Sequence, residues 1–416
     1  MTEPATLKSP TFDPRAESAA WRSVLGKCGL VYVFSRLCVS IGAAIVAAEL
    51  RADDNLVKAN FPNATFADPH YASKAIPKSA IQPMLDVLTS WDGLWYLRIV
   101  RAGYPRHVQA NVTYEMADAR AAFFPAYPML VRAVDFVLPG GDTIAALFTN
   151  FLLGAAAVYL VGLLARELFG IRVSERAMVL MAIFPGSFVL SFAYTEALLL
   201  TLAAGCMWFL LKRQWLLAGV VAALGTATRP NGIALVAACA IASFIAIRER
   251  REWRSLIAPL LSPIGFVGFM LWLGAHTGES GVWFRVQTEA WGEGTSFGLT
   301  AIRRTIKAFT HPLTSPTNTI TAVSVLTLGL LLWFLYKHRL PAFMNAYVAV
   351  VVLLMLLPST VTARPRFVYT AFPLLISAAG WFEHRDRKDW WPYVVGACSA
   401  GLVGLTALYG VLGAIP

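Results

Sequence analysis

The sequence predicts an all-α polytopic membrane protein with about eleven transmembrane helices. Of the 416 residues, 57% are hydrophobic and only 14% are charged, and the mean hydropathy is +0.60. A soluble protein of this size carries a larger charged share on its surface. Many apolar runs also approach the roughly 20 residues that cross a bilayer core of about 30 Å. These observations together place the chain in a membrane.

The expected helices follow from the apolar runs along the chain. They lie at residues 28–49, 143–165, 177–195, 197–211, 215–228, 232–247, 256–275, 319–336, 342–359, 367–382 and 391–414. The run 124–138 is shorter and contains Arg132 and Asp135. Because its length and charges suit an interface better than a span, we expect an in-plane or re-entrant helix there.

The distribution of basic residues predicts the orientation. Five short loops, "RELFGIRVSER", "KRQ", "RERREWR", "KHR" and "EHRDRKD", carry 14 Lys and Arg residues and alternate onto one side of the membrane. The short loops on the other side carry Arg229, Arg364 and Arg366. Since positive loops stay in the cytoplasm, we expect a cytoplasmic N-terminus in an integral plasma membrane protein.

The expected organisation is a cytoplasmic tail at 1–27 and one transmembrane domain at 28–416. The tail lacks the short apolar core and small-residue cleavage site of a signal peptide. Two long extracytoplasmic loops are expected within the domain, at 50–142 and 276–318. Loops of that length without repeats or low complexity usually carry function.

Composition also disfavours several kinds of site. The formal net charge of +11 is explained by the basic cytoplasmic loops, and no basic-aromatic platform suggests nucleic acid. The five cysteines are irregularly spaced and fall in or beside apolar runs, which argues against a disulfide framework or a zinc site. The histidines are scattered, so no divalent metal and no cofactor are expected.

Five charged residues at expected outer helix ends need an explanation: Asp92, Glu196, Arg229, Arg364 and Arg366. A carboxylate in a partly dry aromatic pocket can act as a general base. Arginine side chains present paired N–H donors that match phosphate oxygens. Since the outer side holds no nucleotide sugar, an activated group must arrive there on a lipid. The set therefore suggests a lipid-phosphate substrate in a cavity roofed by the long loops.

Each of these residues also has a purely structural interpretation. Asp92 can be an N-cap, because "WDGLWYLRIV" leads straight into a helical pattern. Glu196 can sit beside a helix N-cap, and Arg229 can extend to lipid headgroups. The last two arginines flank Pro365 and can be interface anchors.

The aromatic residues of the same region carry two interpretations as well. They can stack on sugar rings, or they can form the aromatic belt of a membrane protein. Those expected to bind substrate are Trp91, Trp95, Tyr96, Phe124 and Tyr127.

A family resemblance favours the catalytic interpretation. "SWDGLWYLRIVRAGYP" followed by "AAFFPAYPMLV" resembles the signature of the PIG-V family, the GPI mannosyltransferase 2 type. The block "MAIFPGSFVLSFAYTEALLLTLAAGCMWFLLKRQWLLAGVVAALGTATRPNG" is similar to the next part of that family, and "ARPRFVYTAFPLL" is a weaker match. Together they cover about 90–235 closely and about 360–375 loosely.

The resemblance implies a GT-C-fold glycosyltransferase that takes mannose from a polyprenyl phosphate and inverts the anomeric carbon. Asp92 matches the base, Glu196 the second acidic turn, and Arg229 with Asn231 the Arg-x-Asn-Gly position. Pro230 departs from the small polar residue expected between them. The Ala-rich composition indicates a bacterial member, so the acceptor is expected to be a glycolipid, glycan or protein and not a GPI anchor.

The sequence therefore predicts a mannosyltransferase in which Asp92 accepts the proton of an acceptor hydroxyl. Arg364 and Arg366, with Arg229, are expected to stabilise the departing phosphate. Two alternatives stay open. One keeps the fold and changes the sugar on the polyprenyl phosphate. The other is a transporter or flippase for a lipid-linked substrate, which interrupted helices near "RPNG" also suit.

Overall fold

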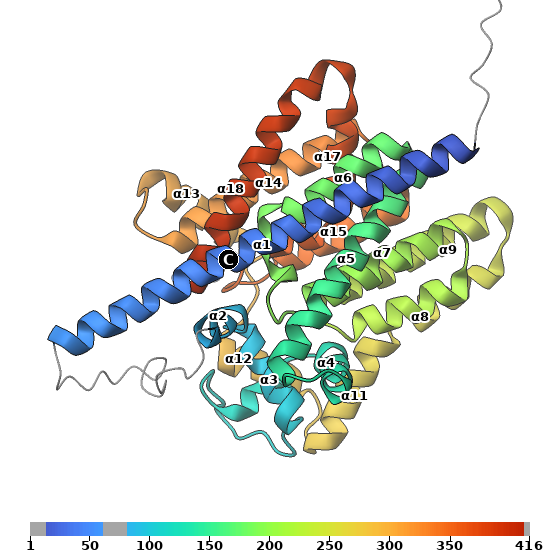
Figure 1. The fold of residues 1–416 in the computed structure, drawn as a ribbon. Coiled ribbons are helices and arrows are strands. Elements are labelled where there is room, and N and C mark those ends of the chain that lie inside the picture. The colour runs from blue at the N-terminus through green and yellow to red at the C-terminus, as the bar shows by residue number, and fades with distance from the viewer. Residues whose placement is uncertain (1–13, 61–80, 412–416) are drawn as a thin grey trace, which may run out of the picture.

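The computed structural model describes residues 14–60 and 81–411, and these are almost entirely helical (Figure 1). A single antiparallel bridge, Thr295 to Pro358, interrupts the helical pattern of the described residues. The α-helices are α1 Pro14–Asn60, α2 Gln82–Leu88, α3 Asp92–Ala102, α4 Ala126–Val137, α5 Asp142–Phe169, α6 Ile171–Ile183, α7 Glu196–Leu211, α8 Trp215–Thr226, α9 Ala234–Arg250, α10 Ile257–Leu261, α11 Ile264–Thr277, α12 Val282–Trp291, α13 Leu299–Thr310, α14 Pro316–Lys337, α15 Ala342–Leu356, α16 Pro365–Thr370, α17 Pro373–Glu383 and α18 Trp391–Gly410. Short 3-10 helices are η1 Ala117–Ala122, η2 Pro185–Leu190, η3 Pro230–Ile233, η4 Trp253–Leu256 and η5 Arg385–Trp390.

The helices have the length and composition of membrane-spanning segments. Within the described part of the chain, six are long and apolar enough to cross a bilayer: Glu17–Leu50, Asp142–Phe169, Pro230–Arg250, Trp253–Thr277, Pro316–Lys337 and Arg387–Gly410. Three shorter apolar helices are α7, α8 and α15. The prediction of an all-α polytopic membrane protein is confirmed. The nine segments match nine of the eleven expected helices.

Prolines divide the two remaining expected helices. The segment expected at 177–195 forms α6, which ends at Ile183, and then η2, which begins at Pro185. The segment expected at 367–382 forms α16 and then α17, which begins at Pro373. Proline has no backbone N–H and clashes with the preceding turn, so each helix stops before it. The composition predicted a continuous apolar run in both places but not the break.

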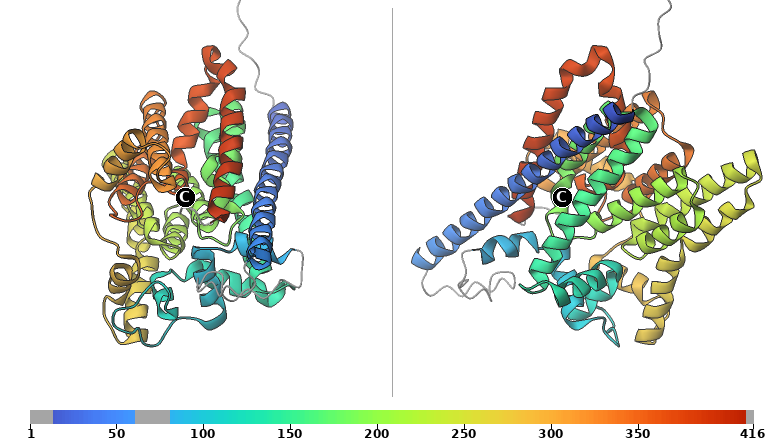
Figure 2. Two further views of the ribbon diagram at one scale, coloured as in Figure 1. Left: turned by 90° about the vertical axis from the view of Figure 1, so that its left-hand side faces the viewer. Right: turned by 45° about the vertical axis from the view of Figure 1, so that its right-hand side comes forward.

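The N-terminal helix is longer than its apolar core. Helix α1 begins at Pro14, inside the expected tail, and continues to Asn60, inside the expected first loop. It runs along the outside of the bundle and packs against α18 and α6 (Figure 2). Residues 1–13 of the expected tail, and 61–80 of the expected first loop, lie outside the described residues. The expected short helix at 124–138 is present as α4.

The five basic loops gather at one end of the bundle. Lys212 forms a 2.5 Å ion pair with Glu167, and Arg213 pairs with Glu252. Arg176 lies 3.1 Å from Glu383, and the rings of Phe169 and His338 are 4.3 Å apart. These contacts connect all five loops in one group. The five loops therefore lie on the same side of the bundle, as expected from the order of the helices along the chain.

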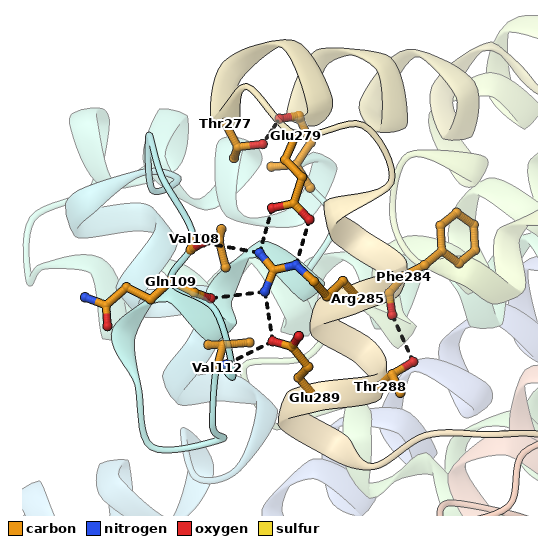
Figure 3. A network of polar contacts seen from close by, with 10 residues as sticks. Val108, Gln109, Val112, Thr277, Glu279, Phe284, Arg285, Thr288 and Glu289 are labelled. Atoms are coloured by element: carbon orange, nitrogen blue, oxygen red, sulfur yellow. Dashed lines mark hydrogen bonds and ion pairs between the residues drawn. The ribbon is translucent and has the colours of Figure 1, made fainter.

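The described parts of the two long loops meet at the opposite end (Figure 1). Arg285 of α12 in the second loop donates to the carbonyl oxygens of Val108 and Gln109 in the first, at 3.2 and 3.1 Å (Figure 3). Glu279 and Glu289 accept from the same guanidinium at 2.6 and 2.8 Å. Arg285 therefore fixes the second loop against the first at this end of the helix bundle.

Candidate active site

Asp92 begins helix α3 without capping it. The N-cap residue is Trp91, whose φ of 56° lies in the left-handed region that is uncommon for a bulky residue. The backbone N–H of Asp92 donates to the hydroxyl of Tyr194 at 3.1 Å. The carboxylate instead meets Arg366, with Nη1 2.8 Å from Oδ2. The structural interpretation of Asp92 as an N-cap is therefore wrong. The strained backbone at Trp91 accompanies the turn that directs the Asp92 side chain toward Arg366.

Arg366 is buried beneath this contact. Its side chain is 5% exposed, against 29% for the side chain of Asp92, so solvent reaches the carboxylate and not the guanidinium. The guanidinium carbon lies 5.4 Å from the Tyr194 ring centroid and 4.9 Å from that of Phe367. These aromatic faces favour a cation and hold the guanidinium in one orientation. Arg366 is thus a buried partner of Asp92 and not an exposed interface anchor.

A second ion pair lies beside the first. Glu196 is the first residue of α7 and is fully buried, and it pairs with Arg229, whose side chain is 12% exposed. The guanidinium carbon of Arg229 is 5.7 Å from the Phe367 ring centroid, so this ring contacts both arginines. Arg229 therefore does not extend to lipid headgroups. Both arginines that pair with acids are held on one aromatic ring.

Arg364 differs from the other two arginines because no carboxylate in the described residues pairs with it. It is 4% exposed and donates from Nη1 to the Thr317 carbonyl oxygen and to Thr321 Oγ1, at 3.3 and 3.2 Å. Burial, with the nearby positive charges of Arg304 and Arg366, lowers the pKa of Arg364 to about 10. Arg364 is thus a buried cation whose charge is left uncompensated.

A pocket of about 170 Å³ opens in front of Asp92. Residues from both long loops and from the "RPNG" turn form its walls, as the roofed cavity expected from the sequence requires. They are Asp92, Tyr96, Ala122, Phe123, Phe124, Arg229, Pro230, Gln287, Trp291, Glu293 and Val361. Two carboxylates, one guanidinium and several aromatic rings therefore face the same space. A concave space lined by aromatic rings and a few converging polar groups is typical of a small-molecule binding site.

The other predicted site residues lie behind these walls. Trp91 is half-buried and donates to the Tyr409 carbonyl oxygen at 3.3 Å, and Trp95 stacks on Phe123 with centroids 5.9 Å apart. Tyr127 is fully buried against Tyr96. Asn231 is half-buried in η3. Of the aromatic residues expected to bind substrate, Tyr96 and Phe124 line the pocket, and the others pack beneath it.

The sequence predicted that the second loop helps to roof the cavity, but it did not single out the residues of that loop that line the pocket. Trp291 and Glu293 of "AWGEG" and Gln287 of α12 line the pocket opposite Asp92. The carboxylate of Glu293 accepts from the backbone N–H groups of Ser359 and Thr360 at 3.0 and 3.1 Å. An acid two residues from a tryptophan, close to the pattern that drew attention to Asp92, was the available signal. Its place in the loop gave no indication that it approaches residues 358–361.

Metal binding has no support from clusters of side chains. Within residues 14–60 and 81–411, no group of three or more His, Cys, Asp or Glu residues could hold a metal ion. The charged groups of this region are the two carboxylate–arginine pairs, Glu293, and Arg364, which pairs with no carboxylate of the described residues.

The middle of the chain matches a known family. Residues 125–274 match the family model described as dolichyl-phosphate-mannose-protein mannosyltransferase. The match runs from the start of α4 into the last turn of α11 and includes Glu196 and Arg229 of the site. No curated protein matches the chain.

Solved structures show a distant similarity. The crystal structure of ArnT from Cupriavidus metallidurans bound to undecaprenyl phosphate is 13% identical, with a TM-score of 0.48, over 77% of this chain and 63% of that one. The Archaeoglobus fulgidus oligosaccharyltransferase in its apo form is 15% identical, with a TM-score of 0.42, over 91% of this chain and 55% of that one. The chain thus spans less than two thirds of the length of either protein.

Proposed function

We propose that this protein is a GT-C glycosyltransferase that transfers mannose from a polyprenyl phosphate to an acceptor hydroxyl on the extracytoplasmic face. The observation that carries the proposal is the pairing of Asp92 with the buried Arg366 at the mouth of an aromatic pocket. The match of residues 125–274 to a mannosyltransferase family supports the choice of sugar and of lipid carrier. The resemblance of the "SWDGLWYLRIV" and "TRPNG" segments to the PIG-V family supports the same choice.

The chemistry assigns one role to each charged group. Asp92 accepts the proton of the acceptor hydroxyl while the hydroxyl oxygen forms a bond to the anomeric carbon. The bond from that carbon to the phosphate oxygen breaks, and the polyprenyl phosphate leaves with the bonding electrons. Attack opposite the leaving group inverts the anomeric configuration, so a β-linked donor yields an α-mannoside. Holding both substrates in line supplies much of the rate.

The arginines divide between orienting and phosphate-binding roles. Arg366 orients the Asp92 carboxylate, and Arg229 neutralises the buried Glu196. Arg364 carries no counter-carboxylate, so it is the arginine best suited to the phosphate as negative charge develops there. In this scheme Arg229 lines the pocket, and Glu196 and Asn231 support that wall from behind. Transfer then needs no metal ion, because guanidinium groups supply the positive charge.

The distribution of loops between the two ends of the helix bundle supports an extracytoplasmic active site. The basic loops lie together at one end of the bundle, and Asp92 lies with the two long loops at the other. With the basic end in the cytoplasm, the site faces the outer side of the plasma membrane. A lipid-linked donor is the form in which an activated sugar reaches that side. The acceptor is a hydroxyl of a glycolipid, glycan or protein.

The decisive experiment is a donor panel with the purified protein in nanodiscs. Radiolabelled polyprenyl phosphates that carry mannose, glucose, galactose or arabinose are each supplied with a membrane extract as the source of acceptor. We expect label in the acceptor from the mannosyl donor only. Transfer from a different donor would keep the enzyme class and change the sugar. In sealed vesicles, movement of an intact donor across the bilayer without transfer would contradict the proposal and favour a flippase.

A further inference from the structure

Helix α13 in the second long loop has an exposed apolar face. Leu299, Ile302, Ile306 and Phe309 are 46%, 57%, 55% and 67% exposed. Their spacing of three, four and three residues places them on one side of the helix. A helix of this kind lies in the plane of a membrane interface with its apolar side among the acyl chains. Helix α13 packs against α14, a candidate membrane span.

The charged residues of α13 occupy two different environments. Arg303 and Lys307 are exposed. Arg304 is half-buried instead, and its Nη1 atom is buried without a hydrogen-bond partner in the part of the chain that the structure describes. A buried donor without a partner costs free energy unless a ligand supplies an acceptor. Arg304 therefore differs from its neighbour Arg303 in a way that indicates a ligand.

Both ends of α13 are tied to the segment that carries Arg364. Before the helix, Ser296 donates its backbone N–H to the Leu357 carbonyl oxygen at 2.8 Å, and Glu293 accepts from residues 359 and 360. After the helix, Thr317 and Thr321 at the start of α14 accept from Arg364. These contacts place α13 next to the segment that carries Arg364.

Arg304 is half-buried on α13, and Arg364 is buried against α14, the helix on which α13 packs. The Nε atom of Arg364 is buried and has no hydrogen-bond partner among the described residues, as is the case for Nη1 of Arg304. The charge of Arg304 is close enough to contribute to the lowered pKa of Arg364. The negative charge of Glu293 acts on Arg304, but the Glu293 carboxylate accepts hydrogen bonds from the backbone N–H groups of residues 359 and 360. Like charges placed together in a protein interior favour binding of an anion.

We propose that Arg304 and Arg364 form a phosphate-binding site for a lipid that is anchored in the membrane surface on which α13 lies. This proposal rests on the proposed function, because the lipid is taken to be the polyprenyl phosphate carrier. It adds Arg304 to Arg364 as a residue that binds the phosphate of that carrier. Guanidinium groups from two elements grip the phosphate oxygens, while the apolar face of α13 is next to the prenyl chain. An ordinary phospholipid offers a phosphate diester with the same charge-assisted chemistry, and the test separates the two.

The test measures binding of undecaprenyl phosphate to the delipidated full chain in detergent by native mass spectrometry. Arg304→Gln is compared with Arg303→Gln, which removes the same charge from the adjacent, exposed position. We expect Arg304→Gln to weaken binding about tenfold or more, because a charge-assisted hydrogen bond is lost. Arg303→Gln is expected to change binding less than about twofold, as exposed charges contribute little. Equal effects of the two variants, or no effect of Arg304→Gln, would overturn the proposal.

Two further arms complete the design. Phosphatidylglycerol and inorganic phosphate replace undecaprenyl phosphate, and we expect neither to show the difference between the two variants. A difference that is as large with phosphatidylglycerol would reject the carrier as the specific ligand. Should Arg304→Gln unfold easily, Arg304→Lys decides: partial recovery of binding supports a direct phosphate contact, and no recovery contradicts it. Binding is measured without sugar or acceptor, so a failed transfer assay would overturn the proposed function and leave this site standing.

Discussion

Nη1 of Arg366 lies 2.8 Å from Oδ2 of Asp92, although 274 residues of chain separate them. The contact joins the start of α3 to the start of α16 and places a solvent-accessible carboxylate on a buried cation. A carboxylate held in this way has a fixed direction of approach for an acceptor hydroxyl. The first prediction tests that role directly.

Replacement of Asp92 by Asn is expected to lower the rate of sugar transfer by about 10²- to 10⁴-fold, because a proton acceptor is lost from the transition state. The measurement is transfer from polyprenyl-phosphate-mannose by purified protein. Glu115→Gln, an exposed position in the same loop, is the matched control and should retain the wild-type rate. Transfer by Asp92→Asn at the wild-type rate would show that Asp92 is not the base.

The pair of Glu196 and Arg229 is expected to stabilise the fold. Glu196→Gln leaves a nearly buried guanidinium without its counter-ion, and the loss of one partner of a buried pair costs about 3–5 kcal/mol. Glu167→Gln, which breaks the exposed pair with Lys212, should cost less than about 1 kcal/mol. Unfolding in detergent, followed by tryptophan fluorescence, measures both. Similar losses for the two variants would argue against a special role for the buried pair.

Gly186 of η2 lets Arg366 take its place. A Cβ atom there would overlap the carbonyl oxygen of Pro365 and come within 2.8 Å of the Tyr369 Cβ, so η2 and α16 can pack this closely only with glycine. Gly186→Ala is expected to shift α16 and to lower transfer by about 10²-fold through misplaced groups. In Gly396→Ala the added methyl group meets nothing within 4 Å, and activity should be unchanged. A fully active Gly186→Ala variant would show that the position of α16 is not critical.

The contact between Glu279 and Arg285 predicts a pH dependence of stability. The hydrogen bond from Arg285 lowers the pKa of the Glu279 carboxyl below its ordinary value of 4.5. A carboxyl with a depressed pKa in the folded state stabilises that state above the ordinary value, and the contribution is lost as the pH falls through the folded pKa. The melting temperature should therefore fall more steeply in wild type than in Glu279→Gln below about pH 4.5. Parallel pH profiles would contradict this prediction.

Removal of divalent metal ions is expected to leave transfer unchanged. Arginine side chains supply the positive charge that a metal would otherwise bring to the leaving phosphate. The measurement is the rate of transfer after dialysis against EDTA, with the dialysis repeated in the presence of Mg²⁺ or Mn²⁺. A loss that either ion restores would show that the reaction depends on a metal.

Local composition predicted most of the helical segments. The apolar runs near 143–165, 232–247 and 319–336 each form one helix of sufficient length to span a membrane, because a helix satisfies its own backbone hydrogen bonds in lipid. Proline breaks within 177–195 and 367–382 could have been placed from the same sequence, since the effect of proline on a helix is local. The grouping of basic loops was predicted as well, because it follows from the alternation of spans.

For the site, the sequence by itself determined that Asp92, Glu196 and the three arginines lie at helix ends on one side of the bundle. Only the tertiary structure decided that Asp92 pairs with Arg366, that Glu196 pairs with Arg229, and that Arg364 has no carboxylate partner. It also brought Trp291 and Glu293 from the second loop to the same region. Helix formation depends on neighbours within a few turns. Charge pairing across hundreds of residues depends on how the helices pack, which no local pattern specifies.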